Sequence, residues 1–372
     1  MRHRVYLSVF VLLPLGIAFL AAEIAVRLFS PEGFITPEIL SRRQLQYASA
    51  VFARTQLPLR AQNLSKDNRP LAYINSKGYR GEEFETQKPV GTTRILIYGG
   101  SSTYDIHARL GQDWPHLTEI ELRNRGFSGI QVINAGIPGQ ASFDSFGRLF
   151  AEGHLLSPDY VLFYQGWNDI KMFDNSQPLI RKISPFREDK DPLYHYQNRW
   201  DRLLCEISQL YVRLRYRFIL WRYNAGLEGV KPRGKASEIS ETAVEQFRLT
   251  LEAFVDFALS IHATPVLMLE ARLIHRNNTT AEKAMIQYDY QPLTEEILLK
   301  ASERVESVVR SIAKEKHAVL IDASTPMSGN KIYFQDHIHP NTEGSKKLAQ
   351  ITAEGLAKLL GEGKLQRAVK PN

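Results

Sequence analysis

From Arg94 onward, short runs of apolar residues alternate with longer stretches in which apolar residues recur every three or four positions. The short runs are almost continuously apolar, as expected of strands buried on both faces of a sheet. The longer stretches have the period of helices. The predicted strands are RILIYGG (94–100), IQVINAG (130–136), PDYVLFYQG (158–166), ATPVLMLEA (263–271) and HAVLIDAS (317–324). The predicted helices are DWPHLTEIELRNRGF (113–127), DSFGRLFAEGHLL (144–156) and the segments near 240–262, 293–316 and 341–360. This alternation predicts an α/β fold, a three-layer α/β/α sandwich with a parallel sheet of the flavodoxin-like type.

Two stretches depart from this alternation and set the predicted domain boundaries. Residues 27–93 are rich in Pro, Gly and charge, which indicates a connector before a main domain at 94–362. Residues 171–237 lie between a strand end and the next helix, so we interpret them as an insertion, and 363–372 as a tail. Within the insertion, QLYVRLRYRFILWRY (209–223) mixes arginines with aromatic residues. It fits a membrane-surface or ligand-lining helix, or a lid helix whose arginines reach out to solvent.

The N-terminal segment, residues 1–26, predicts a membrane anchor. Residues 5–22 carry no charge and are about long enough to cross a bilayer as a transmembrane helix, and Pro14 would kink that helix without forbidding it. Arg2 and Arg4 would hold the short end in the cytoplasm, which places the main domain outside it, in the periplasm or on the outer face. A cleaved signal peptide is the alternative, although no convincing small-x-small cleavage site precedes Glu23. A buried N-terminal helix of a soluble domain is the third possibility.

Composition narrows the function classes. The chain has 372 residues, 44% hydrophobic and 23% charged, with a net charge of +7. The basic residues are spread along the chain and form no block, which argues against a nucleic-acid partner. Cys205 is the sole cysteine. An intrachain disulfide and a cysteine zinc site are therefore excluded.

Candidate chemistry gathers in the loops that follow the predicted strands, where ligands bind in open α/β sheets. The first strand runs into Gly99, Gly100 and Ser101, and glycines clear space beside a serine that a base could activate. NAGIPGQAS follows the second strand and carries Gly136, interpreted as a turn glycine, and Gly139. GWNDI (166–170) follows the third strand. Its asparagine, like the Gly139 amide, is a donor of the kind that a developing oxyanion needs, and Asp169 beside it is interpreted as a structural partner.

The base for Ser101 is expected far downstream, in FQDHIHPNTEGSKKLA (334–349). Asp336 and His339 are three residues apart, and a turn at that spacing can hold the carboxylate beside the imidazole. His337 competes for this role, but it sits next to Asp336, where side chains diverge. His107 and His116 follow the nucleophile turn, and neither is tied to a nearby orienting carboxylate.

Taken together, these blocks resemble the SGNH, or GDSL-type, hydrolase family, and they occur in the family's order over about residues 94–360. The GGSST stretch stands where the family has Gly-Asp-Ser-x-Thr, so the resemblance implies that Ser101 is the nucleophile, with Asp336 and His339 completing a triad. It implies an oxyanion hole made by Ser101, Gly139 and Asn168. Gly100 departs from the family pattern, because an aspartate is usual at that position, which puts the geometry of this loop and the substrate preference in question.

The resemblance implies a serine esterase that needs no cofactor or metal. Its substrate would be an ester-bearing carbohydrate or lipid, and the predicted anchor favours O-acetyl groups on envelope or exported carbohydrate. Lipid esters, as for a lysophospholipase, and acyl transfer in place of hydrolysis are alternatives that use the same residues. A non-catalytic glycan-binding homologue is a further alternative. Glu270 and Asp322 end predicted strands and stand as unassigned candidates for lining the cleft.

Overall fold

The computed structural model describes residues 2–29, 74–174, 196–224, 235–286 and 293–369. The chain divides into two compact units, one of residues 1–48 and 183–234 and the other of residues 49–182 and 235–372. The second unit contains the sheet and every predicted site residue.

The second unit is built on a five-stranded sheet of order β2-β1-β3-β4-β5, and all four neighbouring pairs are parallel. The strands are β1 (Thr93–Gly99), β2 (Ile130–Asn134), β3 (Tyr160–Tyr164), β4 (Thr264–Leu269) and β5 (Val319–Asp322). The parallel sheet of the predicted α/β fold is thereby confirmed. Because β2 lies on one side of β1 and β3 on the other, the strand order reverses at β1, and the loops after β1 and β3 meet where such sheets bind ligands.

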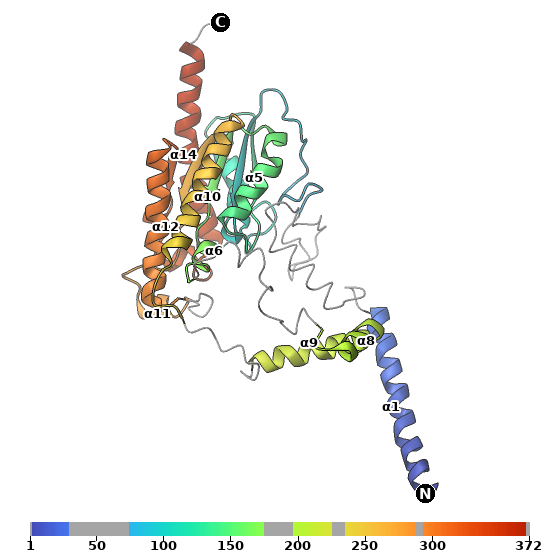
Figure 1. Cartoon of the computed structure of the whole chain (residues 1–372). Coiled ribbons are helices and arrows are strands. Elements are labelled where there is room, and N and C mark those ends of the chain that lie inside the picture. Colours follow the sequence, from blue (N-terminus) through green and yellow to red (C-terminus); the bar gives the residue numbers. More distant parts are fainter. Residues whose placement is uncertain (1, 30–73, 175–195, 225–234, 287–292, 370–372) are drawn as a thin grey trace. The chain divides into compact units, whose positions relative to one another are not determined.

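Helices pack on the sheet in two groups (Figure 1). In one group α4 packs on α14, with α4 against β2 and α14 against β5. In the other, α10 packs on both α5 and α12 and contacts β4. The bounds are α4 (Trp114–Asn124), α5 (Ser142–Leu156), α10 (Glu241–Ser260), α12 (Glu295–Glu315) and α14 (Thr342–Val369). Strand residues such as Ile95, Leu162 and Leu267 are fully buried between these helices, and each such side chain stabilises the fold by about 1.5–3 kcal/mol.

Short elements connect these helices and strands at the sheet's ends. They are α3 (Ser101–Tyr104), α6 (Trp167–Ile170), α11 (Thr280–Lys283), α13 (Ser324–Met327) and the 3-10 helix η2 (Lys331–Tyr333). Of these, α3 and α6 directly follow β1 and β3, so their first residues sit at the carboxyl edge of the sheet.

The last part of the predicted connector belongs to the folded second unit. Tyr79 is buried, and the Arg80 amide donates to the Asn134 carbonyl at 3.2 Å. The buried Arg94 guanidinium donates to the carbonyls of Glu85 and Thr86 at 2.8 Å each. These contacts tie residues 74–92 to the sheet, whereas 30–73 lie outside the described residues.

The first unit joins α1 (Arg2–Phe29) to α8 (Arg199–Ile207) and α9 (Gln209–Asn224). The Glu23 carboxylate of α1 accepts hydrogen bonds from the Ser208 hydroxyl at 2.8 Å and from the amides of Gln209 and Leu210 at 2.9 Å each. Glu23 therefore caps the start of α9. The parts of the predicted insertion at 175–195 and 225–234 lie outside the described residues. Among the described helices, none is both long enough and apolar enough to cross a membrane.

Candidate active site

Ser101 is the first residue of α3, directly beyond the end of β1. The turn is tight: a Cβ at Gly99 would overlap the Thr103 hydroxyl and the Tyr164 carbonyl, so glycine is needed there. The Thr103 hydroxyl in turn donates to the Tyr164 carbonyl at 2.8 Å. At the other end of α3, Asp105 adopts a left-handed φ of 63° and accepts the Trp114 amide at 3.0 Å. Both ends of the short helix are therefore fixed, and with them the position of Ser101.

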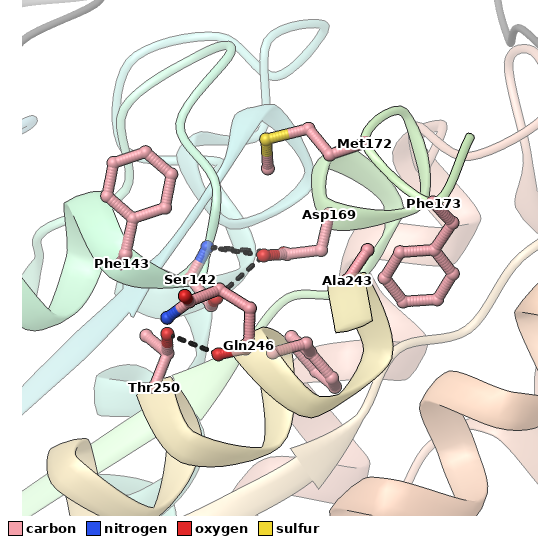
Figure 2. Close-up of a pocket in the computed structure, with 9 residues that line it drawn as sticks. Ser142, Phe143, Asp169, Met172, Phe173, Ala243, Gln246 and Thr250 are labelled. Carbon is pink, nitrogen blue, oxygen red and sulfur yellow. Dashed lines mark hydrogen bonds between the residues drawn. The ribbon is translucent and has the colours of Figure 1, made fainter. Parts of the chain in front are cut away.

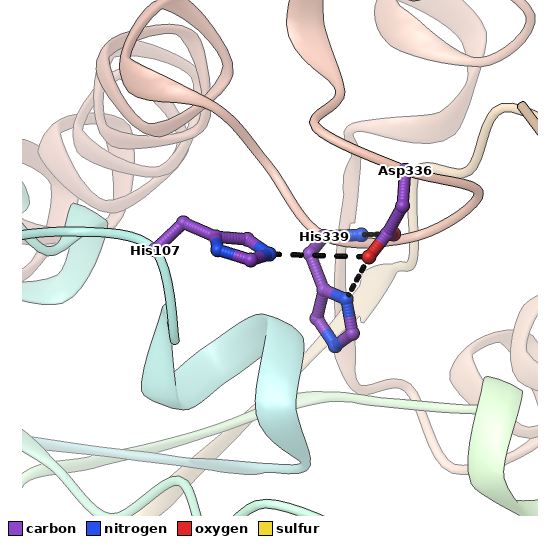
Figure 3. Close-up of side chains that lie close together, drawn as sticks. All are labelled: His107, Asp336 and His339. Atoms are coloured by element: carbon purple, nitrogen blue, oxygen red, sulfur yellow. Dashed lines mark hydrogen bonds and ion pairs between the residues drawn. The ribbon is translucent and has the colours of Figure 1, made fainter.

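The structure brings Ser101, His339 and Asp336 into one hydrogen-bonded chain. His339 Nε2 lies 2.7 Å from Ser101 Oγ. On the other side of the ring, His339 Nδ1 lies 2.7 Å from Asp336 Oδ2 (Figure 3). The amides of Ile338 and His339 each donate to Asp336 Oδ1 at 2.9 Å. Both side-chain contacts are within the distance at which a positioned base can take a proton, and the order of groups is that of a Ser–His–Asp triad.

The charge of Asp336 follows from its partners. Burial alone would raise the pKa of this carboxyl, but the hydrogen bonds from the His339 ring and from the two backbone amides outweigh burial. The net effect is a pKa well below the usual range, so Asp336 is ionised at neutral pH. An ionised Asp336 holds the proton of His339 on Nδ1 and leaves Nε2 free to accept one.

His337 occupies a different environment from His339. It is buried against the Trp167 ring, with ring centroids 4.9 Å apart. Burial lowers its pKa from 6.5 to about 4, with smaller opposing and supporting effects from the charges of Asp336 and His339. The residue that contacts Ser101 is His339, as the spacing to Asp336 predicts.

His107 lies much closer to Asp336 than the sequence indicates. Its Nε2 is 3.9 Å from Asp336 Oδ2, and its ring meets that of His339 edge to face at 5.6 Å between centroids. Burial, followed by the nearby His339, lowers the pKa of His107. The sequence pattern does not indicate this contact, because Asp336 is distant along the chain and only the folding of the sheet brings the two together.

The loops after β2 and β3 converge on the nucleophile turn. The Asn168 side-chain amide donates to the Gln140 carbonyl at 2.8 Å, which joins the loop after β3 to the loop that carries Gly139. A Cβ at Gly100 would lie 2.7 Å from Asn168 Nδ2, so the asparagine amide rests directly on the nucleophile turn. Gly139 has a left-handed φ of 81°. The predicted oxyanion residues thus lie on loops that are packed against one another.

Gly136 has a geometric role, as expected of a turn glycine. A Cβ at this position would overlap the Tyr104 amide and lie 2.8 Å from the Thr103 carbonyl carbon. Only a glycine allows the loop after β2 to approach the backbone of α3 so closely.

Asp169 has a structural role next to the site and binds Ser142. Its Oδ1 accepts the Ser142 hydroxyl at 2.6 Å and the Ser142 amide at 3.0 Å, so it ties α6 to the start of α5 (Figure 2). The cavity beside this contact has a volume of about 10 Å³, roughly the room that one water needs. Asp169 is therefore a structural residue of a closely packed region.

Of the two unassigned strand-end acids, Glu270 reaches the site and Asp322 does not. Glu270 is 5% exposed, and its Oε2 accepts the Trp167 amide at 2.7 Å, next to Asn168. Burial raises its pKa. Asp322 instead pairs with Arg310 at 2.7 Å and bonds to Thr325 at 2.8 Å. An acid directly after an almost entirely apolar strand was the sequence signal for Glu270.

Comparison with known proteins finds a matching family and several similar solved structures. The model of the GDSL-like Lipase/Acylhydrolase family matches residues 97–347. Solved structures that match the chain include the psychrotrophic esterase EstA from a Pseudoalteromonas species, at 17% identity, 72% coverage of this chain, 99% of that chain and a TM-score of 0.42. Another is the acetylxylan esterase Axe2 from Geobacillus stearothermophilus, at 16% identity, 72% and 96% coverage and a TM-score of 0.43. None of the curated proteins matches the chain in sequence.

Proposed function

Because the chain belongs to the GDSL-like lipase/acylhydrolase family, we propose that Ser101, His339 and Asp336 hydrolyse carboxylic esters through an acyl-enzyme. Membership of this family means that the protein is a serine ester hydrolase. The observation that carries the assignment of residues is the pair of 2.7 Å contacts that link the serine hydroxyl, the imidazole and the carboxylate.

In the first half of the reaction, His339 Nε2 takes the proton of Ser101 as its Oγ attacks the ester carbonyl. The imidazolium that forms is stabilised by ionised Asp336 at Nδ1. Collapse of the tetrahedral intermediate breaks the bond to the alcohol oxygen, and His339 gives that oxygen its proton. Ser101 is left as an acyl ester.

In the second half, water takes the place of the alcohol. His339 Nε2 removes a proton from the water, whose oxygen attacks the acyl carbon, and the proton then returns to Ser101 as the acid leaves. Both tetrahedral intermediates carry an oxyanion, which the Ser101 and Gly139 amides and the Asn168 side chain would stabilise. One hydrogen of the Asn168 amide is engaged by Gln140, which fixes the direction of the other.

The proposed substrate class is an O-acetyl ester on envelope or exported carbohydrate. This choice rests on the predicted extracytoplasmic position of the domain, where such polymers are exposed. Lipid esters are the second candidate, and a specific observation favours them: α8 and α9 expose Trp200, Leu204, Phe218 and Trp221 among several arginines. Such a surface suits the interface of a bilayer.

A panel of p-nitrophenyl acetate, butyrate and long-chain esters separates the two substrate classes. We expect kcat/KM to be highest for acetate and to fall by at least about tenfold by the octanoate, as for an enzyme whose natural acyl group is acetyl. Release of acetate from acetylated polysaccharide should parallel this profile. A preference for long chains would refute the carbohydrate proposal and support the lipid candidate.

We also propose that residues 5–22 anchor the protein in a membrane, with the second unit outside the cytoplasm. The uncharged length and the arginines before it support this. The full-length protein is expected to sediment with membranes and to resist alkaline carbonate extraction, whereas a variant lacking residues 2–22 is released. Recovery of the full-length protein in the soluble fraction would contradict the proposal.

A further inference from the structure

Three potential metal ligands from two distant parts of the chain meet at the edge of the catalytic group. His107 lies in the loop between α3 and α4, and Asp336 and His339 lie in the turn before α14 (Figure 3). One ligating atom from each lies within 4.8 Å of the other two. Two imidazoles and one carboxylate are a ligand set that zinc commonly binds.

The distances suit a small divalent ion. Zinc binds imidazole nitrogen and carboxylate oxygen at about 2.0–2.2 Å, so ligand atoms in a tetrahedral site lie roughly 3.3 Å apart. The observed separations from Asp336 Oδ2 lie on either side of this value, 3.9 Å to His107 Nε2 and 2.7 Å to His339 Nδ1. The His107 side chain is 40% exposed, so it can move the few tenths of an ångström required.

We propose that His107, Asp336 and His339 form an inhibitory zinc site, with His107 Nε2, Asp336 Oδ2 and His339 Nδ1 as the ligands. Solvent would complete a tetrahedral coordination. This inference rests on the proposed function, because inhibition presupposes that His339 is the base for Ser101.

Zinc would inhibit the enzyme because it changes which ring nitrogen of His339 carries the proton. In the active tautomer the proton of His339 is on Nδ1, facing Asp336, and Nε2 holds the lone pair that accepts the Ser101 proton. Zinc needs the lone pair of Nδ1, so the proton of the neutral ring must be on Nε2. The ring stays neutral and no proton is gained or lost, but Nε2 now carries a hydrogen and cannot act as a base. Zinc also replaces the contact between Asp336 and the ring.

His107 distinguishes this site from general metal effects, because it contributes to the zinc site and has no part in the proposed proton transfers. The matched control is His154, an exposed histidine in the last turn of α5. Each variant is compared with its own metal-free rate, so that any small change in basal activity cancels.

The first measurement is zinc binding to the full-length protein by competition with a chromogenic chelator, which needs no ester hydrolysis. We expect one zinc per chain with micromolar affinity, at least about tenfold weaker binding in His107→Ala, and no change in His154→Ala. The Ser101→Ala protein should bind zinc like the wild type, since Ser101 is not a ligand. Absence of binding to the wild-type protein, or equal binding to the His107→Ala variant, would overturn the zinc site.

The second measurement is inhibition of p-nitrophenyl acetate hydrolysis by buffered zinc and its reversal by EDTA. The zinc concentration for half inhibition should rise at least about tenfold in His107→Ala and stay constant in His154→Ala. Equal inhibition of all three proteins would overturn the proposal. Because binding is scored separately, a protein that binds zinc as predicted but hydrolyses no ester would refute the esterase proposal and leave the metal site standing.

Discussion

Replacing Ser101 with alanine is expected to lower kcat for ester hydrolysis by about 10⁴- to 10⁶-fold, because the remaining groups have no nucleophile to activate. The fold should be unaffected, since the backbone of α3 is held by the contacts of Thr103 and Asp105 and not by the Ser101 hydroxyl. Steady-state kinetics with p-nitrophenyl acetate measure the first effect, and circular dichroism with thermal unfolding measures the second.

The neighbouring serine is the matched control. The hydroxyl of Ser102 donates to the Ile338 carbonyl at 3.5 Å, whereas His339 Nε2 contacts the hydroxyl of Ser101, so Ser102→Ala should keep most of its activity. Labelling by a fluorophosphonate probe should be lost in Ser101→Ala and retained in Ser102→Ala. A Ser101→Ala enzyme with more than a few per cent of wild-type activity would remove Ser101 from the role of nucleophile.

Gly100→Ala is expected to lower kcat by about 10²- to 10³-fold, the usual effect of losing one oxyanion donor. The φ of −89° at this position is open to any residue, so the effect comes from the new side chain alone. Its Cβ would lie 2.7 Å from Asn168 Nδ2 and 3.3 Å from the Gln140 carbonyl oxygen. The asparagine amide must then move from the nucleophile turn, while the contacts of His339 with Ser101 and Asp336 stay in place.

A double-mutant cycle with Asn168→Ala tests whether the effect of Gly100→Ala acts through the asparagine. If it does, the double variant should be no slower than Asn168→Ala alone. Gly361→Ala, on α14, is the control, because a Cβ there has nothing within 4 Å. If the fold-decreases in kcat of the two single variants instead multiply in the double variant, Gly100 acts by another route. The same geometry gives a reason for glycine where the family usually has aspartate: in this chain, Asn168 occupies the space of the missing side chain.

The sheet and the contact between His339 and Asp336 could be predicted because their signals are local. Each strand, such as 95–98 in β1, is an almost unbroken apolar run, and an acid three residues before a histidine defines a turn by itself. The sequence predicts a parallel sheet but not the order of its strands, since nothing in residues 130–134 indicates which strand they pair with.

What could not be predicted depends on contacts between distant segments. The proximity of His107 to Asp336 and the bond from the Trp167 amide to Glu270 exist only once separate strand ends share one edge of the sheet. The packing of Tyr79 and Arg80 was missed for a different reason. Their segment has neither a strand nor a helix period, yet Tyr79 is buried and an isolated bridge from Arg80 to Asn134 joins the segment to β2.

The cap that Glu23 places on α9 bears on how the N-terminus is processed. Cleavage just before Glu23 would make this residue the new N-terminus and leave only residues 23–29, about two turns, of the original helix. An isolated helix of that length is not stable in water, so the carboxylate would lose its fixed position and the donors at the start of α9 would lose their acceptor. Signal-peptidase processing would therefore change more than attachment to a membrane. Only the unprocessed chain keeps the contact of Glu23 on α1 with the start of α9. The intact mass of the mature protein distinguishes the two forms.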